Sequence, residues 1–279
     1  MARFPAAVIG FAMRHAYTPD PARQSPASDA CRRRFVAALS AVPSRVAAAL
    51  IFLRTSMKVL RYSPGLLAFF ALWHPVPVRA AASMVVDDAG VTPRGQCQLE
   101  AWWRATPGGA SATAVPACNV LGTEFSVGIT DVRHGSAALD IGAKHMLRDP
   151  EQHVWGLAVA VGLQRDWQDP QQRASYLTVP LTWSFGADGA TRMHVNLGLV
   201  ALHAGSDATT AGAGLEQVLT PKWTVLAEAS GDDRNGWGAQ IGMRRPMGRA
   251  SSVDLMVGRD HVAAPRGWIT LGVNLAMSP

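Results

Sequence analysis

The feature that most constrains the fold of this chain is a strict alternation of apolar and polar residues in stretches of about ten residues. Between Tyr176 and Phe185 the sequence reads YLTVPLTWSF, in which large apolar residues occupy every second position. Successive side chains of a β-strand point to opposite faces, so this pattern predicts a strand with one apolar and one mostly polar face. The same pattern recurs in residues 153–166, 191–202 and 268–275. The chain is therefore expected to be all-β.

The length of these stretches separates two kinds of β protein. Strands of soluble sandwiches usually have five or six residues, whereas a tilted strand that crosses a bilayer has about ten. Lipid offers no partners to an open sheet edge, so membrane strands must close into a barrel. We expect an antiparallel up-and-down transmembrane β-barrel of about 12 strands, with about 10 as the alternative, and both termini of the barrel chain on the periplasmic side. The expected strand ranges are 96–104, 112–118, 123–130, 136–147, 153–166, 174–186, 190–203, 209–219, 222–230, 236–246, 250–260 and 266–277.

A secretory signal peptide is indicated inside the chain. From Met57 the sequence reads MKVLRYSPGLLAFFALWHPVPVRAAAS, with a basic start, an apolar run too short to span a bilayer, and alanines for a signal peptidase. Such a signal works only at an N-terminus. We therefore interpret residues 1–56 as a non-native upstream extension, disordered or weakly helical, residues 57–82 as the signal peptide, and residues 83–279 as a barrel of a Gram-negative outer membrane. The alternative is that the first segment is a long n-region or a transit-like stretch.

The positive charge of the chain belongs to its first part. Residues 1–56 hold eight Arg and two Asp, whereas residues 83–279 hold 15 Lys and Arg against 18 Asp and Glu. The high isoelectric point is therefore no argument for nucleic-acid binding. The histidines of the exported segment show no metal-ligand spacing, and no phosphate-binding motif opens a helix. We expect no nucleic acid, no metal and no cofactor.

Two of the three cysteines, Cys97 and Cys118, lie in the exported segment. An even number of cysteines in an exported chain favours one disulfide. Cys97 opens the first expected strand and Cys118 closes the second, so antiparallel pairing can bring both to the same periplasmic end. The alternative is two unrelated buried thiols.

Tryptophans are expected at the two membrane interfaces, where an amphipathic ring prefers to sit. In the expected layout Trp155, Trp183 and Trp223 fall near the periplasmic interface, whereas Trp237 and Trp268 fall near the outer one. The alternative is that these rings belong to the core of a soluble protein.

Charged residues are expected on the inner face of the barrel. The alternation places ten of them there: Glu100, Arg104, Glu124, Asp140, Lys144, Arg192, Glu216, Glu228, Arg244 and Asp254. One interpretation is a set of ion pairs that brace a structural barrel and close its lumen, since buried charges demand partners. The other is a charge-lined constriction that filters small solutes. We expect a narrow pore, with the closed structural barrel as the alternative.

Catalysis is a remote alternative. His134 and Ser136 stand two residues apart, as a lipid hydrolase of the outer membrane could use them. Nucleophilic catalysis also needs an orienting group and an oxyanion site, which nothing in the sequence indicates. We therefore expect no enzyme.

The closing strand fits the assembly signal of outer-membrane barrels at Thr270, Gly272, Leu275 and Met277, although the usual final aromatic residue is missing. The expected partners are thus the barrel-assembly machinery and outer-membrane lipid, with a small solute in the lumen.

Several strings of the sequence resemble those of a known family of outer-membrane proteins. The strings CQLEAWWR, VPACNV, WGLAVAVG, YLTVPLTWSFG, MHVNLGL, LTPKWTVLAEASG and RGWITLGVNLA resemble those of uncharacterised outer-membrane β-barrel proteins of Gram-negative bacteria, which are similar to the outer-membrane proteins associated with phenol-degradation pathways. The resemblance covers residues 95–277 and brings no catalytic residue with it. It implies passage of small solutes, aromatic ones among them.

Overall fold

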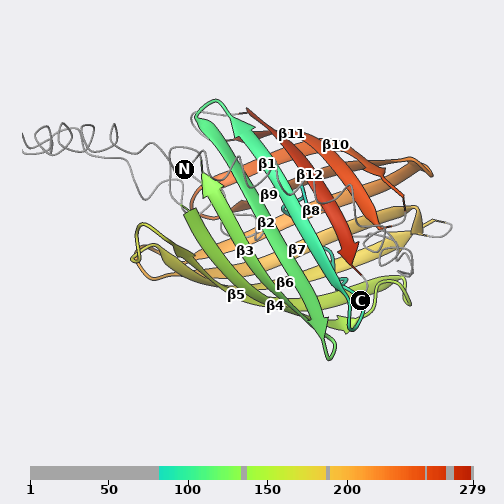
Figure 1. The fold of residues 1–279 in the computed structure, drawn as a ribbon, viewed down its shortest axis with the longest axis horizontal. Helices are drawn as coiled ribbons and strands as arrows, with labels where there is room; N and C mark the ends of the chain where they lie inside the picture. Colours follow the sequence, from blue (N-terminus) through green and yellow to red (C-terminus); the bar gives the residue numbers. More distant parts are fainter. Residues whose placement is uncertain (1–81, 133–136, 187–188, 249, 262–266, 278–279) are drawn as a thin grey trace, which may run out of the picture. The chain divides into compact units, whose positions relative to one another are not determined.

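The fold is a closed antiparallel β-barrel of twelve strands in the described part of the chain (Figure 1). The structure is a computed structural model and describes residues 82–132, 137–186, 189–248, 250–261 and 267–277. Each strand pairs with its neighbours in sequence, and β1 pairs with β12 to close the barrel. The strands are β1 (Cys97–Thr106), β2 (Gly109–Val120), β3 (Thr123–Val132), β4 (Ala137–Arg148), β5 (Trp155–Asp166), β6 (Arg173–Phe185), β7 (Thr191–Leu202), β8 (Ala208–Thr220), β9 (Trp223–Asp232), β10 (Gly236–Pro246), β11 (Ser251–His261) and β12 (Gly267–Met277).

The expected fold is confirmed, with twelve strands rather than ten. The largest difference is at β2, which was expected over 112–118 and runs over Gly109–Val120. Its small residues carry little alternation, but the whole of β1 pairs with it, from Cys97 opposite Cys118 to Thr106 opposite Gly109. Backbone pairing with a neighbour therefore extends this strand beyond its sequence signal. Among the described residues no helix has the length and hydropathy to cross a membrane.

Apolar side chains cover the outside of the barrel and polar side chains line the inside. On β7, Leu197 is 60% exposed whereas its neighbour Asn196 is 6% exposed. On β12, Ile269 and Leu271 face outward, and Thr270 is fully buried within the barrel. This arrangement is the reverse of a soluble core and is typical of a barrel whose outer surface contacts lipid.

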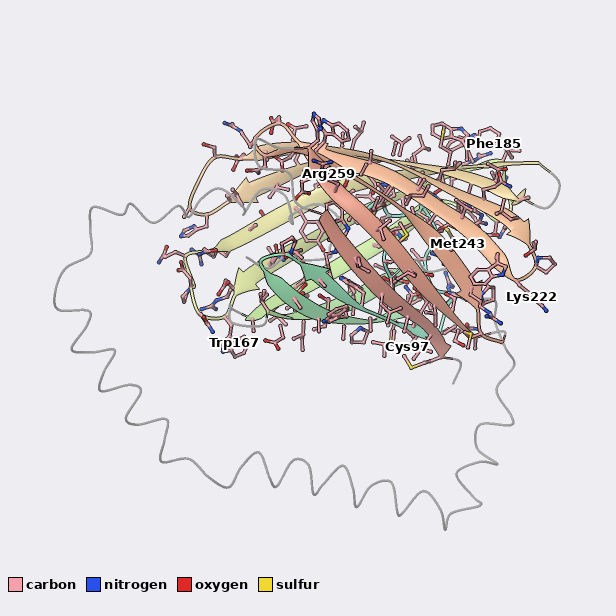
Figure 2. The ribbon with its side chains drawn as sticks, turned by 90° about the horizontal axis from the view of Figure 1, so that it is seen from above. Cys97, Trp167, Phe185, Lys222, Met243 and Arg259 are labelled. Atoms are coloured by element: carbon pink, nitrogen blue, oxygen red, sulfur yellow. A yellow bond between two sulfur atoms is a disulfide. The ribbon has the colours of Figure 1, made fainter. Side chains whose placement is uncertain are left out.

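The two ends of the barrel can be followed in the structure. Cys97, Phe185 and Lys222 lie towards one end, and Trp167 lies at the other (Figure 2). Trp155 and Trp183 are cross-strand partners at the Phe185 end.

Two further tryptophans that were expected at the interfaces also lie on the outer surface. Trp223 begins β9 at the same end as the Trp155 pair, and Trp237 lies near the start of β10 at the opposite end. Both are exposed, at 38% and 49%. The expectation for Trp268 is wrong, because its side chain points into the lumen and is 6% exposed. Ile269 faces lipid, and successive side chains of a strand point to opposite faces, so Trp268 points inward.

The lumen has space for the Trp268 ring because the facing residue on β11 is a glycine. A Cβ atom on Gly258 would lie 2.2 Å from the Trp268 ring. Inside the barrel, Trp268 Nε1 donates a hydrogen bond to Gln240 Oε1 at 2.8 Å, and the Arg104 guanidinium lies 5.5 Å from the ring centroid. Trp268 is therefore part of the packed lumen.

The expected disulfide between Cys97 and Cys118 is present, and it joins β1 to β2 at the end where the chain enters the barrel. The two cysteines are direct cross-strand partners, with their Cα atoms 4.0 Å apart. We expect that a thiol reagent labels neither cysteine in unreduced protein, even after unfolding, and labels both after reduction. Mass spectrometry of tryptic peptides checks this, and labelling without reductant would contradict it.

Candidate functional site

The lumen holds a segment of the chain itself. Residues 82–94, here called the strap, precede β1 and follow the inner wall from β12 round to β3. At its start, the Ala82 amide donates to Asn274 Oδ1 on β12 at 2.6 Å. At its end, the Thr92 amide donates to Glu124 Oε2 on β3 at 2.7 Å. The strap therefore lies across the interior and narrows it.

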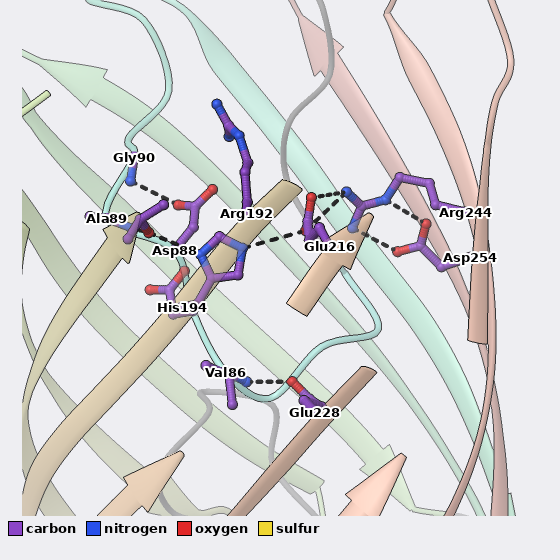
Figure 3. Close-up of polar contacts among 12 residues, drawn as sticks. Val86, Asp88, Ala89, Gly90, Arg192, His194, Glu216, Glu228, Arg244 and Asp254 are labelled. Atoms are coloured by element: carbon purple, nitrogen blue, oxygen red, sulfur yellow. Dashed lines mark hydrogen bonds and ion pairs between the residues drawn. The ribbon is translucent and has the colours of Figure 1, made fainter. Parts of the chain in front are cut away.

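Two inward side chains hold the middle of the strap. Both carboxylate oxygens of Glu228 accept the Val85 amide, at 2.7 and 2.9 Å, and Glu228 Oε2 also accepts the Val86 amide at 2.8 Å (Figure 3). Asn196 accepts the Asp87 amide at 2.7 Å and donates to the Asp87 carbonyl at 2.8 Å. These side chains supply the partners that strap amides would otherwise lack, and charge-assisted bonds to a carboxylate are the stronger kind.

Apolar contacts also seat the strap. Met84 packs against Leu226 and Met256, both of which are fully buried. A Cβ atom on Gly214 of β8 would lie only 2.9 Å from the Met84 methyl group. The glycine thus allows the strap to approach the wall at this point.

A cluster of charges braces the wall beside the strap. Arg244 on β10 bonds to Asp254 on β11, with Nε 2.9 Å from Oδ1, and to Glu216 on β8, with Nη1 3.2 Å from Oε1 (Figure 3). His194 Nε2 lies 4.0 Å from the same Glu216 oxygen. Asp254 is fully buried and Arg244 is 5% exposed, so the charges depend on one another for compensation. Asp254 also accepts a hydrogen bond from Ser83 of the strap at 2.9 Å.

Lys144 of β4 joins the wall to the strap by ion pairs. Its Nζ lies 2.8 Å from Asp87 Oδ1 and 3.5 Å from Asp88 Oδ1. Burial alone would raise the pKa of Asp88, but the nearby positive charges, of which Lys144 contributes most, act together with the hydrogen bond from the Gly90 amide and hold that pKa below its ordinary value. The strap therefore brings two acids to a single base.

A cavity of about 620 Å³ remains between the strap and the barrel wall, most of it along β1 to β6. Glu100 and Trp102 of β1, Asp140 of β4, and Tyr176 and Thr178 of β6 line it. It is large enough for a small organic molecule.

All ten of the predicted lumen charges point into the barrel, but they do not form one cluster. Four of them contact the strap: Glu124, Lys144, Glu228 and Asp254. Two more, Arg244 and Glu216, pair with each other; Arg192 pairs with Glu151 in the connection between β4 and β5; and Arg104 donates to Thr270 Oγ1. The last two, Glu100 and Asp140, line the cavity.

Sequence reasoning missed the strap and the uncharged side chains that hold it. Asn196, Gln240 and Asn274 stand at inward positions of the alternation, which was the available signal. Nothing in that pattern indicates that their partners are Asp87, Ser83 and Ala82, which precede the first strand. His134 and Ser136, the remote catalytic candidates, lie outside the described residues. Within the residues that the structure describes, no group of three or more His, Cys, Asp or Glu side chains could hold a metal ion.

One protein family matches the barrel-forming part of this chain. The chain belongs to the family described as Uncharacterised conserved protein UCP029691. The family profile matches residues 68–277, which include the strap and every strand. None of the curated proteins compared with this chain matches it.

Solved structures share the fold at low sequence identity. The KdgM porin in complex with disordered oligogalacturonate has a TM-score of 0.55 and 8% identity, covering 65% of this chain and 99% of that one. The NanC porin has a TM-score of 0.50 and 6% identity, covering 64% of this chain and 98% of that one. At this level of identity the likeness shows that the β-barrel fold is shared.

Proposed function

We propose that this chain is an outer-membrane pore for small solutes, narrowed by its own strap. The observation that carries the proposal is a cavity of about 620 Å³ inside a closed barrel whose inner wall is polar. Support for the membrane location comes from the apolar outer face and from the likeness to the KdgM and NanC porins. A barrel with a polar interior offers a path for molecules that lipid excludes.

The strap controls the width of that path. It is joined to β1 through a short turn, in which the Gln96 amide donates to the Pro93 carbonyl and the Gly95 amide to the Asn119 carbonyl, both at 3.0 Å. Its remaining contacts with the wall are hydrogen bonds, ion pairs and apolar packing. Such contacts can be exchanged for contacts with water, so displacement of the strap would widen the pore without breaking the barrel.

The solute is not carried over from the similar porins. Galacturonate units bear carboxylates, whereas the cavity of this chain is lined by acids such as Glu100, Glu124 and Asp140, with Lys144 already paired to the strap. Like charges repel across a narrow lumen. The link to phenol-degradation pathways and the passage of aromatic solutes remain predictions from sequence resemblance.

Conductance of the purified chain in a planar bilayer tests the pore. We expect protein isolated from outer membranes to conduct weakly in potassium chloride. Deletion of residues 84–91 should raise the single-channel conductance, because it removes the segment that crosses the lumen. Asp233→Asn, in the exposed connection between β9 and β10, should leave the conductance unchanged.

The alternative is a structural barrel with a closed lumen, and the Arg244 cluster is the observation that favours it. If the deleted variant keeps the heat-sensitive gel mobility of a folded barrel and still carries no current, the pore proposal is wrong and the structural barrel replaces it. Release of fatty acid that is lost in Ser136→Ala would point to the lipid hydrolase.

A further inference from the structure

The cavity beside the strap contains more acid than its own bases compensate. Asp140 is 7% exposed, and its Oδ2 atom has no hydrogen-bond partner. Glu100 takes part in no ion pair within the described part of the chain, although it lines the same cavity. Lys144 is occupied by Asp87 and Asp88 of the strap. A buried carboxylate without a partner is costly, so a cation in this cavity would be stabilised.

An uncharged group in the cavity also lacks a partner. Thr178 on β6 is 3% exposed, and its hydroxyl makes no hydrogen bond in the structure. The Tyr176 hydroxyl, two residues away, donates to Asp140 Oδ1 at 3.2 Å, which orients that carboxylate and leaves Oδ2 available. Thr178 lies in register with Lys144 through Ala160, whereas Asp140 pairs with Gln164, so these are two separate acceptors that different donors could satisfy.

The two cavity carboxylates stand at opposite ends of an apolar floor. Glu100 on β1 pairs with Val115 on β2, and Gly128 on β3 pairs with Asp140 on β4. A Cβ atom on Gly128 would lie 3.5 Å from a Val115 methyl group and 3.2 Å from Asp140 Cβ, so the floor between them is close-packed. The strand spacing places the backbones of the two acids about 14 Å apart. The two inward side chains shorten the gap between the carboxylates, and a chain-like molecule with a charge at each end can bridge what remains.

We infer that the cavity binds small aliphatic diamines, one ammonium group at Asp140 and the other at Glu100. An ammonium group has three donors and no acceptor, which matches the unpartnered Asp140 Oδ2. The methylene groups lie along Val115 and Gly128. The Trp102 and Tyr176 rings, which line the same cavity, can also attract a cation. The inference names the solute class of the pore proposed above, and it rests on that function.

Binding to protein purified from outer membranes in detergent tests the site, with 1,5-diaminopentane as the probe in isothermal titration calorimetry. The diamine should bind more tightly than 1-aminopentane, and 1,5-pentanediol and sodium chloride should give no saturable binding. Asp140→Asn and Glu100→Gln should each weaken the diamine by roughly tenfold or more, as expected for the loss of one charged hydrogen bond. Asp233→Asn, which changes an acid outside the cavity, should bind as the unaltered protein does.

The outcomes separate this inference from the pore proposal. If the protein conducts potassium chloride but 1,5-diaminopentane neither binds nor changes the current, the inference is wrong and the pore stands. Two further results would overturn it. One is that the protein binds the diamine and the diol with equal affinity, and the other is that Asp140→Asn binds the diamine as tightly as the unaltered protein does. Saturable diamine binding that needs both carboxylates supports the site, even if no variant conducts, in which case the pore proposal fails. The comparison of 1,5-diaminopentane, 1-aminopentane and 1,5-pentanediol uses the unaltered protein, so it tests the inference even if a variant fails to fold.

Discussion

Replacement of Arg244 by Met is expected to lower the free energy of unfolding by roughly 3–5 kcal/mol. The guanidinium bonds to Asp254 at 2.9 Å and to Glu216 at 3.2 Å. Met would fill a similar volume but would leave two inward carboxylates without this cation, and Asp254 is fully buried. Urea unfolding of the barrel in lipid vesicles, followed by tryptophan fluorescence, measures the change.

The neighbouring residue gives a matched control for this prediction. Arg245 is exposed, and its guanidinium lies 5.3 Å from the centroid of the Trp223 ring on the outer side of the barrel. Arg245→Met should cost at most about 1 kcal/mol, the value of an exposed cation–π contact. In Arg244→Met, a second change of Asp254→Asn should recover part of the loss, because it removes one of the unpaired charges. Equal losses for the two arginine variants would mean that the cluster does not brace the wall.

Leu197→Arg is expected to cost roughly 2–4 kcal/mol, because this side chain faces lipid near the middle of β7. Leu197 is 60% exposed on the outer surface of the barrel. Leu219 is similarly exposed, at 58%, but lies one residue from the end of β8. Leu219→Arg should therefore cost only about 0–1 kcal/mol, since the charge can reach the interface. The same unfolding measurement in vesicles compares the two, and similar costs would argue against a membrane at the middle of β7.

The wall of the barrel could be predicted from the sequence because lipid and lumen impose opposite requirements on alternate residues. On β5 the outward side chains run from Trp155 to Leu163 in strict alternation, as expected. The prediction failed at Trp268, where the general preference of tryptophan for interfaces and the alternation point to different faces of the strand. Thr270 and Asn274 are inward on the same strand, so period two alone would have placed the ring in the lumen.

The strap could not be predicted because it has no periodic pattern and its contacts are remote in sequence. Val85 and Glu228 are 143 residues apart, yet the hydrogen bond between them makes the Glu228 carboxylate an acceptor for the strap backbone. The alternation shows only that Glu228 points inward. Whether it meets a cation, a solute or a backbone amide depends on which segment enters the barrel. The sequence thus predicted the direction of the lumen side chains and not their partners.

The path of the strap also sets an order of events during biogenesis. Ala82 and Ser83 are made before any strand, but their partners Asn274 and Gln240 belong to β12 and β10. The strap cannot gain its full set of bonds until the last strand has been synthesised. That strand is also the one that seals the barrel against β1. A strap that makes all of its hydrogen bonds therefore requires a complete chain. In a chain that stops before β12, Ala82 has no Asn274 to bind.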